Sequence, residues 1–393
     1  MRLVCLIDSL GPGGAQRQLS TLAVLLGRRG FDVEVLTYHA GDFFLPELAR
    51  AGIPVRCVER GSIARRALAL RGALRASAPD VVLAFLDASC LYAELAALPA
   101  RRFGLVVSER LAVPREREGR LRWTRQLHRV ADFVVTNSHT NRLLIERAVP
   151  ALAGRLVTIY NAVDLDVFRP PVVPPSPRQG ALRLVVAASY QAKKNLAGLI
   201  DAVARARRLK PERPIVVDWY GGAPQGVGGR PDLRVREEGL AQIGVHRLEE
   251  CFRLHDTSRS MVEIYQAADA VVLPSFFEGL PNTVCEAMAC GRPVLMSAVC
   301  DASGLVEPGR SGLLFDPSSP EDMARALVAM ASLSPAERDA LGARARAIAE
   351  RTFDGERFAG HYAEVLRAAA SRERVAIPHW LPEVPATALR SVA

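Results

Sequence analysis

The apolar residues of this 393-residue chain alternate between short runs rich in valine, leucine and isoleucine and longer stretches with helical spacing. In the first half, the short runs predict strands at residues 2–7, 33–37, 81–85, 104–107, 133–136 and 156–160. Between the first two, residues 15–30 place apolar side chains on one face of a helix that ends at Gly30. A strand, a helix and another strand at this spacing predict βαβ units and a parallel sheet.

The same pattern begins again near residue 181. The predicted strands of this half are residues 182–189, 214–221, 248–254, 269–275 and 293–297. Predicted helices cover residues 195–209 and 261–268, a further helix holds Glu286, and the alanine-rich chain from Pro320 onward is helical. We therefore predict an α/β protein with two doubly wound, Rossmann-like domains.

A proline-rich segment, residues 169–180, separates the two patterns. Proline cannot continue a helix or a central strand and favours an extended backbone, so this segment is predicted to be a stiff linker. We expect a first domain at residues 1–168, a second at 181–355, and a C-terminal helix and tail at 356–393 that returns to the first domain. Ligands of open α/β sheets bind beyond the carboxyl ends of the strands, so we expect the ligand between the two domains.

Charge is unevenly distributed along the chain. Residues 1–170 hold 24 Lys and Arg against 16 Asp and Glu, a net charge of +8. Residues 171–393 hold 27 against 26, a net charge of +1, which completes the total of +9. The surplus predicts an anionic partner for the first half: a membrane surface, a phosphorylated acceptor or nucleic acid. No zinc-finger, helix-turn-helix or aromatic RNA-binding pattern is present, so we expect no nucleic-acid partner.

The cysteines and the apolar runs indicate where the protein works. The seven cysteines are odd in number and form no C-x-x-C pair, which predicts reduced thiols rather than a disulfide framework. Asp8 interrupts the apolar start of the chain, so a buried strand explains it better than a signal peptide. No apolar run reaches the length of about 18 residues typical of a membrane span. We expect a cytoplasmic protein.

The loop "SLGPGGAQRQL" joins the first predicted strand to the first helix. Its glycines, Gly13 and Gly14 among them, allow a sharp turn and a close approach to a ligand, and a helix amino terminus is an anion site. A dinucleotide fingerprint would need glycine where Gln16 stands, so these residues argue against a nicotinamide site. A tight turn that merely needs glycine is the alternative.

Lys194 follows the first strand of the second half and precedes a helix that we expect to begin near Asn195. A cation beside a helix amino terminus disfavours the helix unless an anion such as a diphosphate lies between them. An exposed surface lysine is the alternative interpretation.

The segment "SFFEGLPNTVCEAMACGRPVL" places one glutamate on each side of a turn. Glu278 lies in the loop, Asn282 is the expected N-cap, Glu286 lies in the first helical turns, and Gly291 ends the helix. The helix dipole alone accounts for Glu286, but not for Glu278. Two such carboxylates could bind two sets of vicinal sugar hydroxyls, one on a hexose and one on a ribose.

This segment resembles the E-x7-E signature of the family-four retaining glycosyltransferases, which have the GT-B fold. The loop "GPGGAQRQL", the junction "IYNAVDLDVF" and the segment "LVEPGRSGLLFDPSSPEDMARAL" resemble other parts of that family in the same order. The resemblance covers roughly residues 1–365 and is densest at 180–330. It is of the bacterial polysaccharide or cell-envelope type.

The resemblance implies a role for each matching residue. Glu278 and Lys194 would be catalytic, the first holding the donor sugar and the second neutralising its diphosphate, and Glu286 would bind the ribose. It implies no cofactor and no metal, because cations and helix ends take over the charge of the nucleoside diphosphate sugar. The implied donor-binding set is Gly13, Gly14, Ser189, Lys193, Gly279, Leu280, Asn282, Thr283 and Glu286.

One position departs from the family pattern. The family usually has arginine five residues before the lysine, where this chain has Ser189. The diphosphate would lose a cationic partner, whose charged hydrogen bonds are each worth roughly 1.5–3 kcal/mol. Lys193, Arg253 or Arg259 could compensate.

The acceptor side is less distinct. Relatives often carry a functional histidine after the strand that here ends in "VVSER", so Glu109 and Arg110 are acceptor-side candidates. His139 is a third candidate, although a structural histidine is the favoured interpretation. From Arg115 to Arg129 arginines alternate with Leu and Trp, which fits either a basic amphipathic helix on an anionic membrane surface or a solvated helix with one packed face.

We predict a glycosyltransferase that moves a hexose from a nucleotide-sugar donor to a saccharide or lipid-linked acceptor, in polysaccharide or glycan biosynthesis, on the inner face of the membrane. Two alternatives remain open. One is a sugar-nucleotide 2-epimerase of the same fold, and the other is a non-catalytic relative that binds nucleotide sugars, for which Ser189 speaks.

Overall fold

A computed structural model describes residues 1–59, 61–111, 119, 121–172, 180–224 and 231–371. These residues fold into two compact units. The first unit comprises residues 1–162 and the described chain from Gly355 onward, and the second comprises residues from Val163 to Asp354. In the described ranges, no helix has both the length and the apolar character needed to cross a membrane.

The first unit is built on a seven-stranded parallel sheet with the order β3-β2-β1-β4-β5-β6-β7. Its strands are β1 (Arg2–Leu6), β2 (Asp32–Thr37), β3 (Val55–Cys57), β4 (Val81–Phe85), β5 (Gly104–Glu109), β6 (Phe133–Thr136) and β7 (Leu156–Thr158). The chain moves outward in one direction from β1 to β3 and in the other from β4 to β7. The strand order therefore reverses between β1 and β4.

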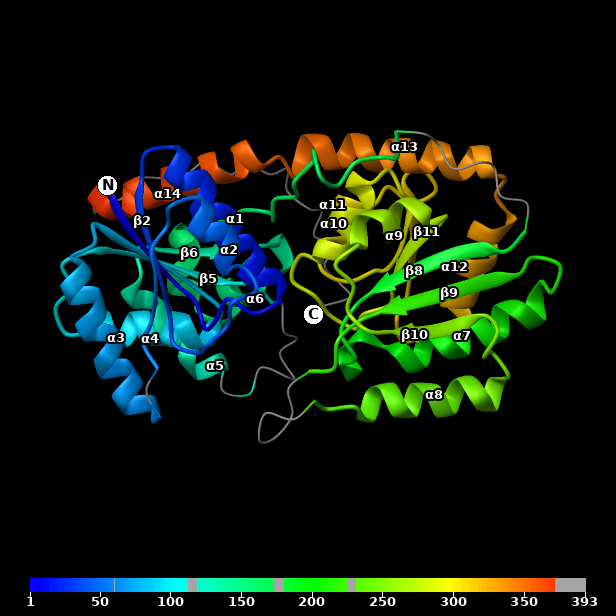
Figure 1. Ribbon diagram of the computed structural model, residues 1–393, viewed down its shortest axis with the longest axis horizontal. Coiled ribbons are helices and arrows are strands. Elements are labelled where there is room, and N and C mark those ends of the chain that lie inside the picture. The colour runs from blue at the N-terminus through cyan, green and yellow to red at the C-terminus, as the bar shows by residue number, and fades with distance from the viewer. Residues whose placement is uncertain (60, 112–118, 120, 173–179, 225–230, 372–393) are drawn as a thin grey trace. The chain divides into compact units, whose positions relative to one another are not determined.

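Helices cover both faces of this sheet (Figure 1). They are α1 (Gly14–Arg28), α2 (Leu45–Arg50), α3 (Ile63–Ser77), α4 (Asp87–Ala97), α5 (Leu121–Thr124), α6 (His139–Ala148), α14 (Gly355–Ser371) and the 3-10 helices η2 (Arg125–Val130) and η3 (Pro150–Arg155). Successive side chains of a strand point to opposite faces. Accordingly, Leu3 and Cys5 pack with α1 and α14, and Val4 and Leu6 pack with α3 and α4.

The second unit repeats this plan with a six-stranded parallel sheet in the order β10-β9-β8-β11-β12-β13. Its strands are β8 (Leu182–Ala187), β9 (Ile215–Tyr220), β10 (Phe252–His255), β11 (Ala270–Leu273), β12 (Val294–Ser297) and β13 (Gly312–Phe315). Its helices are η4 (Ala192–Lys194), α7 (Leu196–Leu209), α8 (Arg234–His246), α9 (Met261–Ala267), α10 (Asn282–Ala289), α11 (Ala302–Leu305), α12 (Pro320–Ser332) and α13 (Pro335–Thr352). Here the strand order reverses between β8 and β11.

The predicted fold class is confirmed: both units are doubly wound α/β structures, and the expected strands are present. The glycine stops are also in place, because Gly30 and Gly291 have the positive φ angles of +83° and +67° that follow a helix end. Two edge strands, β3 and β13, were not predicted. Much of the proline-rich segment, residues 173–179, lies outside the described residues.

Candidate functional site

The switch point of the second sheet brings two predicted site residues together. Lys194 ends the short helix η4 after β8, and Glu278 lies in the loop after the neighbouring strand β11. The ammonium group of Lys194 forms an ion pair with the Glu278 carboxylate, and both side chains are largely buried. The interpretation of Lys194 as an exposed surface lysine is therefore wrong.

The loops that carry this pair are tied to each other and to the following helix. The backbone N–H of Phe276 donates to the carbonyl of Lys193 at 2.8 Å. Asn195 adopts the left-handed conformation, with φ of +58°, and its side-chain oxygen accepts from the N–H of Gly198 at 3.2 Å, which caps α7. The backbone thus fixes where Lys194 points.

Lys193 is a second cation at this edge. Its ammonium group lies 5.8 Å from the centre of the Phe277 ring. Burial is the main cause that lowers the pKa of Lys193, and Lys194 adds to it, whereas Glu278 opposes both. One carboxylate therefore faces two cations, a balance that leaves room for a further anion.

Glu286 lies in the second turn of α10 and is buried, and the hydroxyl of Tyr265 donates to its carboxylate at 3.1 Å. Thr283 ties the start of α10 to the end of β8 by donating to the carbonyl of Ala187 at 2.7 Å. The expectation that Asn282 caps this helix is wrong. Pro281 holds the N-cap position and Asn282 is the first helical residue, because the proline favours the extended backbone of a cap.

The remaining donor-side candidates lie close in sequence to these residues. Gly279 and Leu280 are buried between Glu278 and the start of α10. Ser189 follows β8, and its carbonyl accepts from the N–H of Gln191 at 2.8 Å. Arg253 lies two strands away on β10, exposed and 3.9 Å from Asp218, so Lys193 is the better placed substitute for the missing arginine.

The glycine loop of the first unit leads directly into α1. Gly13 is the N-cap, without a side-chain cap hydrogen bond, and Gly14 is the first helical residue. A Cβ atom at Gly13 would lie 2.0 Å from Oε1 of Gln16, whose amide donates to Asp8 at 2.9 Å. Gln16 therefore occupies the space beside Gly13 and ties the start of α1 to Asp8, just beyond the end of β1.

Glu109, an acceptor-side candidate, belongs to a buried ionic cluster with Arg125, His128 and Glu94. Arg125 donates to both oxygens of Glu109, with the shortest contact at 2.8 Å. His128 donates to Glu109 at 2.9 Å through Nε2 and to Glu94 through Nδ1. All four side chains are at most 3% exposed, so Glu109 is engaged by the fold itself.

The cluster controls the protonation of its members. Burial alone would raise the pKa of Glu109, but hydrogen bonds from His128 and Arg125 outweigh it and lower that pKa to about 2. Burial alone would lower the pKa of His128, but hydrogen bonds to Glu109 and Glu94 raise it to about 10. Burial raises the pKa of the neighbouring Asp87 to about 6. His128 is thus an imidazolium at neutral pH.

The stabilising effect of His128 should therefore depend on pH. A group whose pKa is raised on folding stabilises fully below its unfolded pKa, here 6.5, and loses this contribution as the pH rises toward about 10. We expect the difference in unfolding free energy between the wild type and His128→Gln to shrink across that range. Denaturant titrations at several pH values measure it, and a difference that stays constant would contradict the assignment.

Two further predictions for this unit concern His139 and the basic segment. His139 begins α6, is buried, and packs edge to face against Tyr160. The basic segment does not form one amphipathic helix in its described part, because α5 passes into η2 and Arg125 points inward to Glu109. Trp123 and Arg129 are exposed, and residues 112–118 and 120 lie outside the described residues.

Two parts of the chain match models of known protein families. The family model described as "Glycosyltransferase Family 4" matches residues 12–167, and the one described as "Glycosyl transferases group 1" matches residues 181–332. The chain belongs to the family-four glycosyltransferases. The two matched ranges contain all of the donor-side and acceptor-side candidates.

Relatives in this family include proteins named D-inositol 3-phosphate glycosyltransferase. That of Arthrobacter sp. (strain FB24) is 30% identical over 241 residues, which are 57% of this chain and 55% of that protein. That of Streptomyces scabiei (strain 87.22) is 31% identical over 261 residues, which are 63% of this chain and 56% of that protein. The chain spans about half the length of the curated relatives it matches.

Solved structures share the fold over nearly the whole chain. Anabaena Alr3699/HepE in complex with UDP and glucose aligns with a TM-score of 0.80 and 23% identity over 93% of this chain and 99% of that one. Sucrose-phosphate synthase from Thermosynechococcus elongatus aligns with a TM-score of 0.78 and 19% identity over 95% of this chain and 100% of that one. At these identities the likeness shows the GT-B fold class alone.

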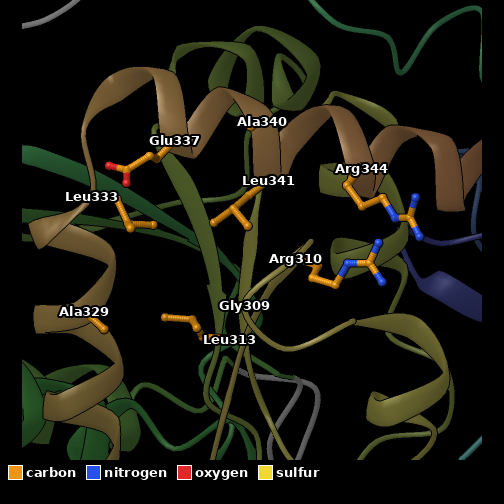
Figure 2. Close-up of a pocket in the computed structure, with 9 residues that line it drawn as sticks. All are labelled: Gly309, Arg310, Leu313, Ala329, Leu333, Glu337, Ala340, Leu341 and Arg344. Atoms are coloured by element: carbon orange, nitrogen blue, oxygen red, sulfur yellow. The ribbon is translucent and has the colours of Figure 1, made fainter.

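A separate pocket of about 470 Å³ lies in the second unit, between α12, α13 and the turn before β13 (Figure 2). Leucines line its middle, and the guanidinium groups of Arg310 and Arg344 lie at one end, where both pair with Glu307. The pocket shares no residue with the Lys194–Glu278 site. It is lined by Gly309, Arg310, Leu313, Ala329, Leu333, Glu337, Ala340, Leu341 and Arg344.

Some functional groups were not foreseen. Tyr265, the partner of Glu286, was not identified from the sequence. Nor were the histidine and the carboxylates around Glu109. The three-residue spacing of Arg125 and His128 was a signal that both could face the same way. In the described residues, no three His, Cys, Asp or Glu side chains gather as a metal site would require.

Proposed function

We propose that this chain is a retaining, metal-independent hexosyltransferase that uses a nucleoside diphosphate sugar and transfers its hexose to a hydroxyl of a saccharide or lipid-linked acceptor. The observation that carries the proposal is the Lys194–Glu278 ion pair at the switch point of the second sheet. A switch point is where doubly wound sheets bind their ligands. Membership of the family supports the same reaction class.

The donor would replace the contact between the two side chains. Glu278 accepts hydrogen bonds from the sugar hydroxyls, and Lys194 turns to the diphosphate, with Lys193 as the second cation. Glu286, steadied by the Tyr265 hydroxyl, accepts hydrogen bonds from the ribose. The residues from Gly279 to Thr283 lead into α10, whose first N–H groups lack a side-chain cap and suit an anion.

The transfer would proceed on one face of the sugar. The acceptor oxygen forms a bond to the anomeric carbon as the bond from that carbon to the diphosphate oxygen breaks. The acceptor's proton passes to the leaving diphosphate, so no separate base is needed. Lys194 stabilises the negative charge that develops on the diphosphate leaving group, as preorganised cations do in transition states of this kind.

Cell-surface polysaccharide or glycan assembly at a membrane's inner face is the proposed setting. The net charge of residues 1–170 and the exposed side chains of Trp123 and Arg129 support contact with an anionic surface. The inward direction of Arg125 restricts that contact to the other arginines of the segment.

Two other functions fit the same residues. A 2-epimerase would convert the donor without any acceptor, so incubation with donor alone separates it from a transferase. A non-catalytic binder would hold the donor without turnover, and Ser189 in place of arginine is the feature that favours it. Lys193 beside the site counts against this second alternative.

The first experiment is a thermal-shift panel of UDP-, GDP-, ADP- and dTDP-sugars, with and without magnesium. A ligand of the folded state at one hundred times its Kd adds about 2.7 kcal/mol to the unfolding free energy. We expect one nucleotide to raise the melting temperature without metal, and the UDP-bound solved neighbour makes UDP-glucose the first to test. Stabilisation by none of them would overturn the proposal, and stabilisation only with magnesium would overturn metal independence.

A further inference from the structure

Arg110 is a buried arginine whose hydrogen-bond acceptors are all neutral. It follows the end of β5 and is 8% exposed. Its guanidinium donates to the hydroxyl of Tyr362 at 3.2 Å, to the hydroxyl of Ser108 at 3.4 Å, and to the side-chain oxygen of Asn161. Among the described residues, no carboxylate forms an ion pair with it.

None of these neighbours supplies a negative charge. Burial raises the pKa of Tyr362, so its hydroxyl stays protonated, although Arg110 lowers that pKa in part. The Phe85 ring lies 4.7 Å below the guanidinium and offers only a cation–π contact. Burial lowers the pKa of Arg110, but an arginine keeps its charge at neutral pH.

Arg125 provides a direct comparison, because it begins η2 and contacts Glu109, the last residue of the same strand. It is fully buried and pairs with both oxygens of Glu109. The fold therefore supplies a counter-ion for one of the two arginines and leaves the charge of the other open. Burying a cation without an anion is costly, which makes such a group a candidate for an anion that arrives with a ligand.

The surroundings of Arg110 also contain unused hydrogen-bond acceptors. Asn137 and Asn141 donate their side-chain N–H groups to the carbonyls of Arg110 and Glu109 at 3.2 and 3.3 Å. Their side-chain oxygens are buried and receive no hydrogen bond in the described part of the chain. A hydroxylated anion could satisfy both needs, because it brings O–H donors together with a negative charge.

We propose that Arg110 binds an anionic group on the acceptor, so that the acceptor is a sugar or similar polyol that carries a phosphate or a carboxylate. The inference rests on the proposed function, because it specifies the second substrate of that reaction. The position agrees with it: Arg110 follows β5, beside β4, at the carboxyl edge of the first sheet, where a doubly wound unit binds its ligand. The surplus of +8 in residues 1–170 favours an anion at this unit.

The test is calorimetric binding of matched neutral and anionic probes: glucose against glucose 6-phosphate, mannose against mannose 6-phosphate, and galactose against galacturonate. We expect at least one anionic member to bind about tenfold more tightly than its neutral partner, as one charge-assisted contact predicts. Arg110→Gln should abolish this preference. Arg29→Gln, which removes an arginine that pairs with Glu356 on the same unit, should keep it.

Equal binding within every pair by the wild type, or a preference that survives in Arg110→Gln, would overturn the inference. If Arg110→Gln does not fold, Arg110→Lys is the second variant. It keeps the positive charge but cannot form the paired hydrogen bonds of a guanidinium, so it should retain a weaker preference for the anionic probes. Donor binding is measured in the same samples with UDP-glucose and the other nucleotide sugars. A chain that binds no donor but prefers the anionic probes refutes the proposed function and not this inference, and the reverse result refutes only the inference.

Discussion

Glu278→Gln should lower turnover roughly a hundredfold to a thousandfold, the loss typical when one preorganised polar group is removed from a transition state. Glutamine keeps the size of the side chain and one acceptor oxygen, but it removes the negative charge. In the wild type, residue Glu278 is 7% exposed and its carboxylate pairs with Lys194. Without that charge, the sugar loses its strongest acceptor next to the reacting carbon.

The same substitution should leave donor affinity nearly unchanged. Lys194 loses its resident partner and becomes more available to the diphosphate, which offsets the lost contact with the sugar. We therefore expect kcat to fall with little change in KM, the pattern of an interaction made mainly in the transition state. Steady-state assays on the nucleotide sugar chosen by the thermal-shift panel measure both constants.

Two other glutamates serve as controls for Glu278. Glu286→Gln should raise KM for the donor more than it lowers kcat, because the ribose is held in both ground and transition states. Glu307→Gln should change neither constant, since Glu307 pairs with Arg344 at the separate pocket. If Glu278→Gln folds and keeps turnover within threefold of the wild type, its assigned role is wrong.

The alternation of apolar runs was enough to predict two doubly wound units, because buried parallel strands read as continuous apolar runs. The strands that were missed lie at sheet edges. Val55–Cys57 is three residues long and mostly exposed, and Gly312–Phe315 begins with glycine. Short edge strands bury only part of their surface, so their sequences differ little from those of loops.

The donor-side residues were found one by one, but their contact was not. Lys194 and Glu278 are 84 positions apart, and only the strand order makes β8 and β11 neighbours. The basic segment failed for a related reason. The spacing of the arginines does not determine which of them face the protein interior. Arg125 points inward because it pairs with Glu109 at the end of β5.

Arg125→Met is expected to cost about 3–5 kcal/mol of unfolding free energy, because it removes one of the two cations that pair with the buried Glu109 carboxylate and leaves His128 as the other. Arg110→Met should cost much less, since it removes a buried charge that has no ionic partner in the described residues and adds apolar volume beside Phe85. The two substitutions are chemically identical, and both positions are next to Glu109: Arg110 follows it in the chain and Arg125 pairs with it. Their difference therefore isolates the effect of the counter-ion.

Chemical denaturation near neutral pH measures both variants, and melting temperatures provide a second readout. For a unit of this size, each kcal/mol corresponds to about 2–4 °C, so Arg125→Met should melt roughly 10 °C lower. The double variant Arg125→Met with Glu109→Gln should recover part of the loss, because it also removes the buried carboxylate that the single variant leaves with His128 alone. Equal losses for Arg125→Met and Arg110→Met would mean that the Glu109 pairing does not distinguish the two arginines, and the argument for an open charge at Arg110 would fall with it.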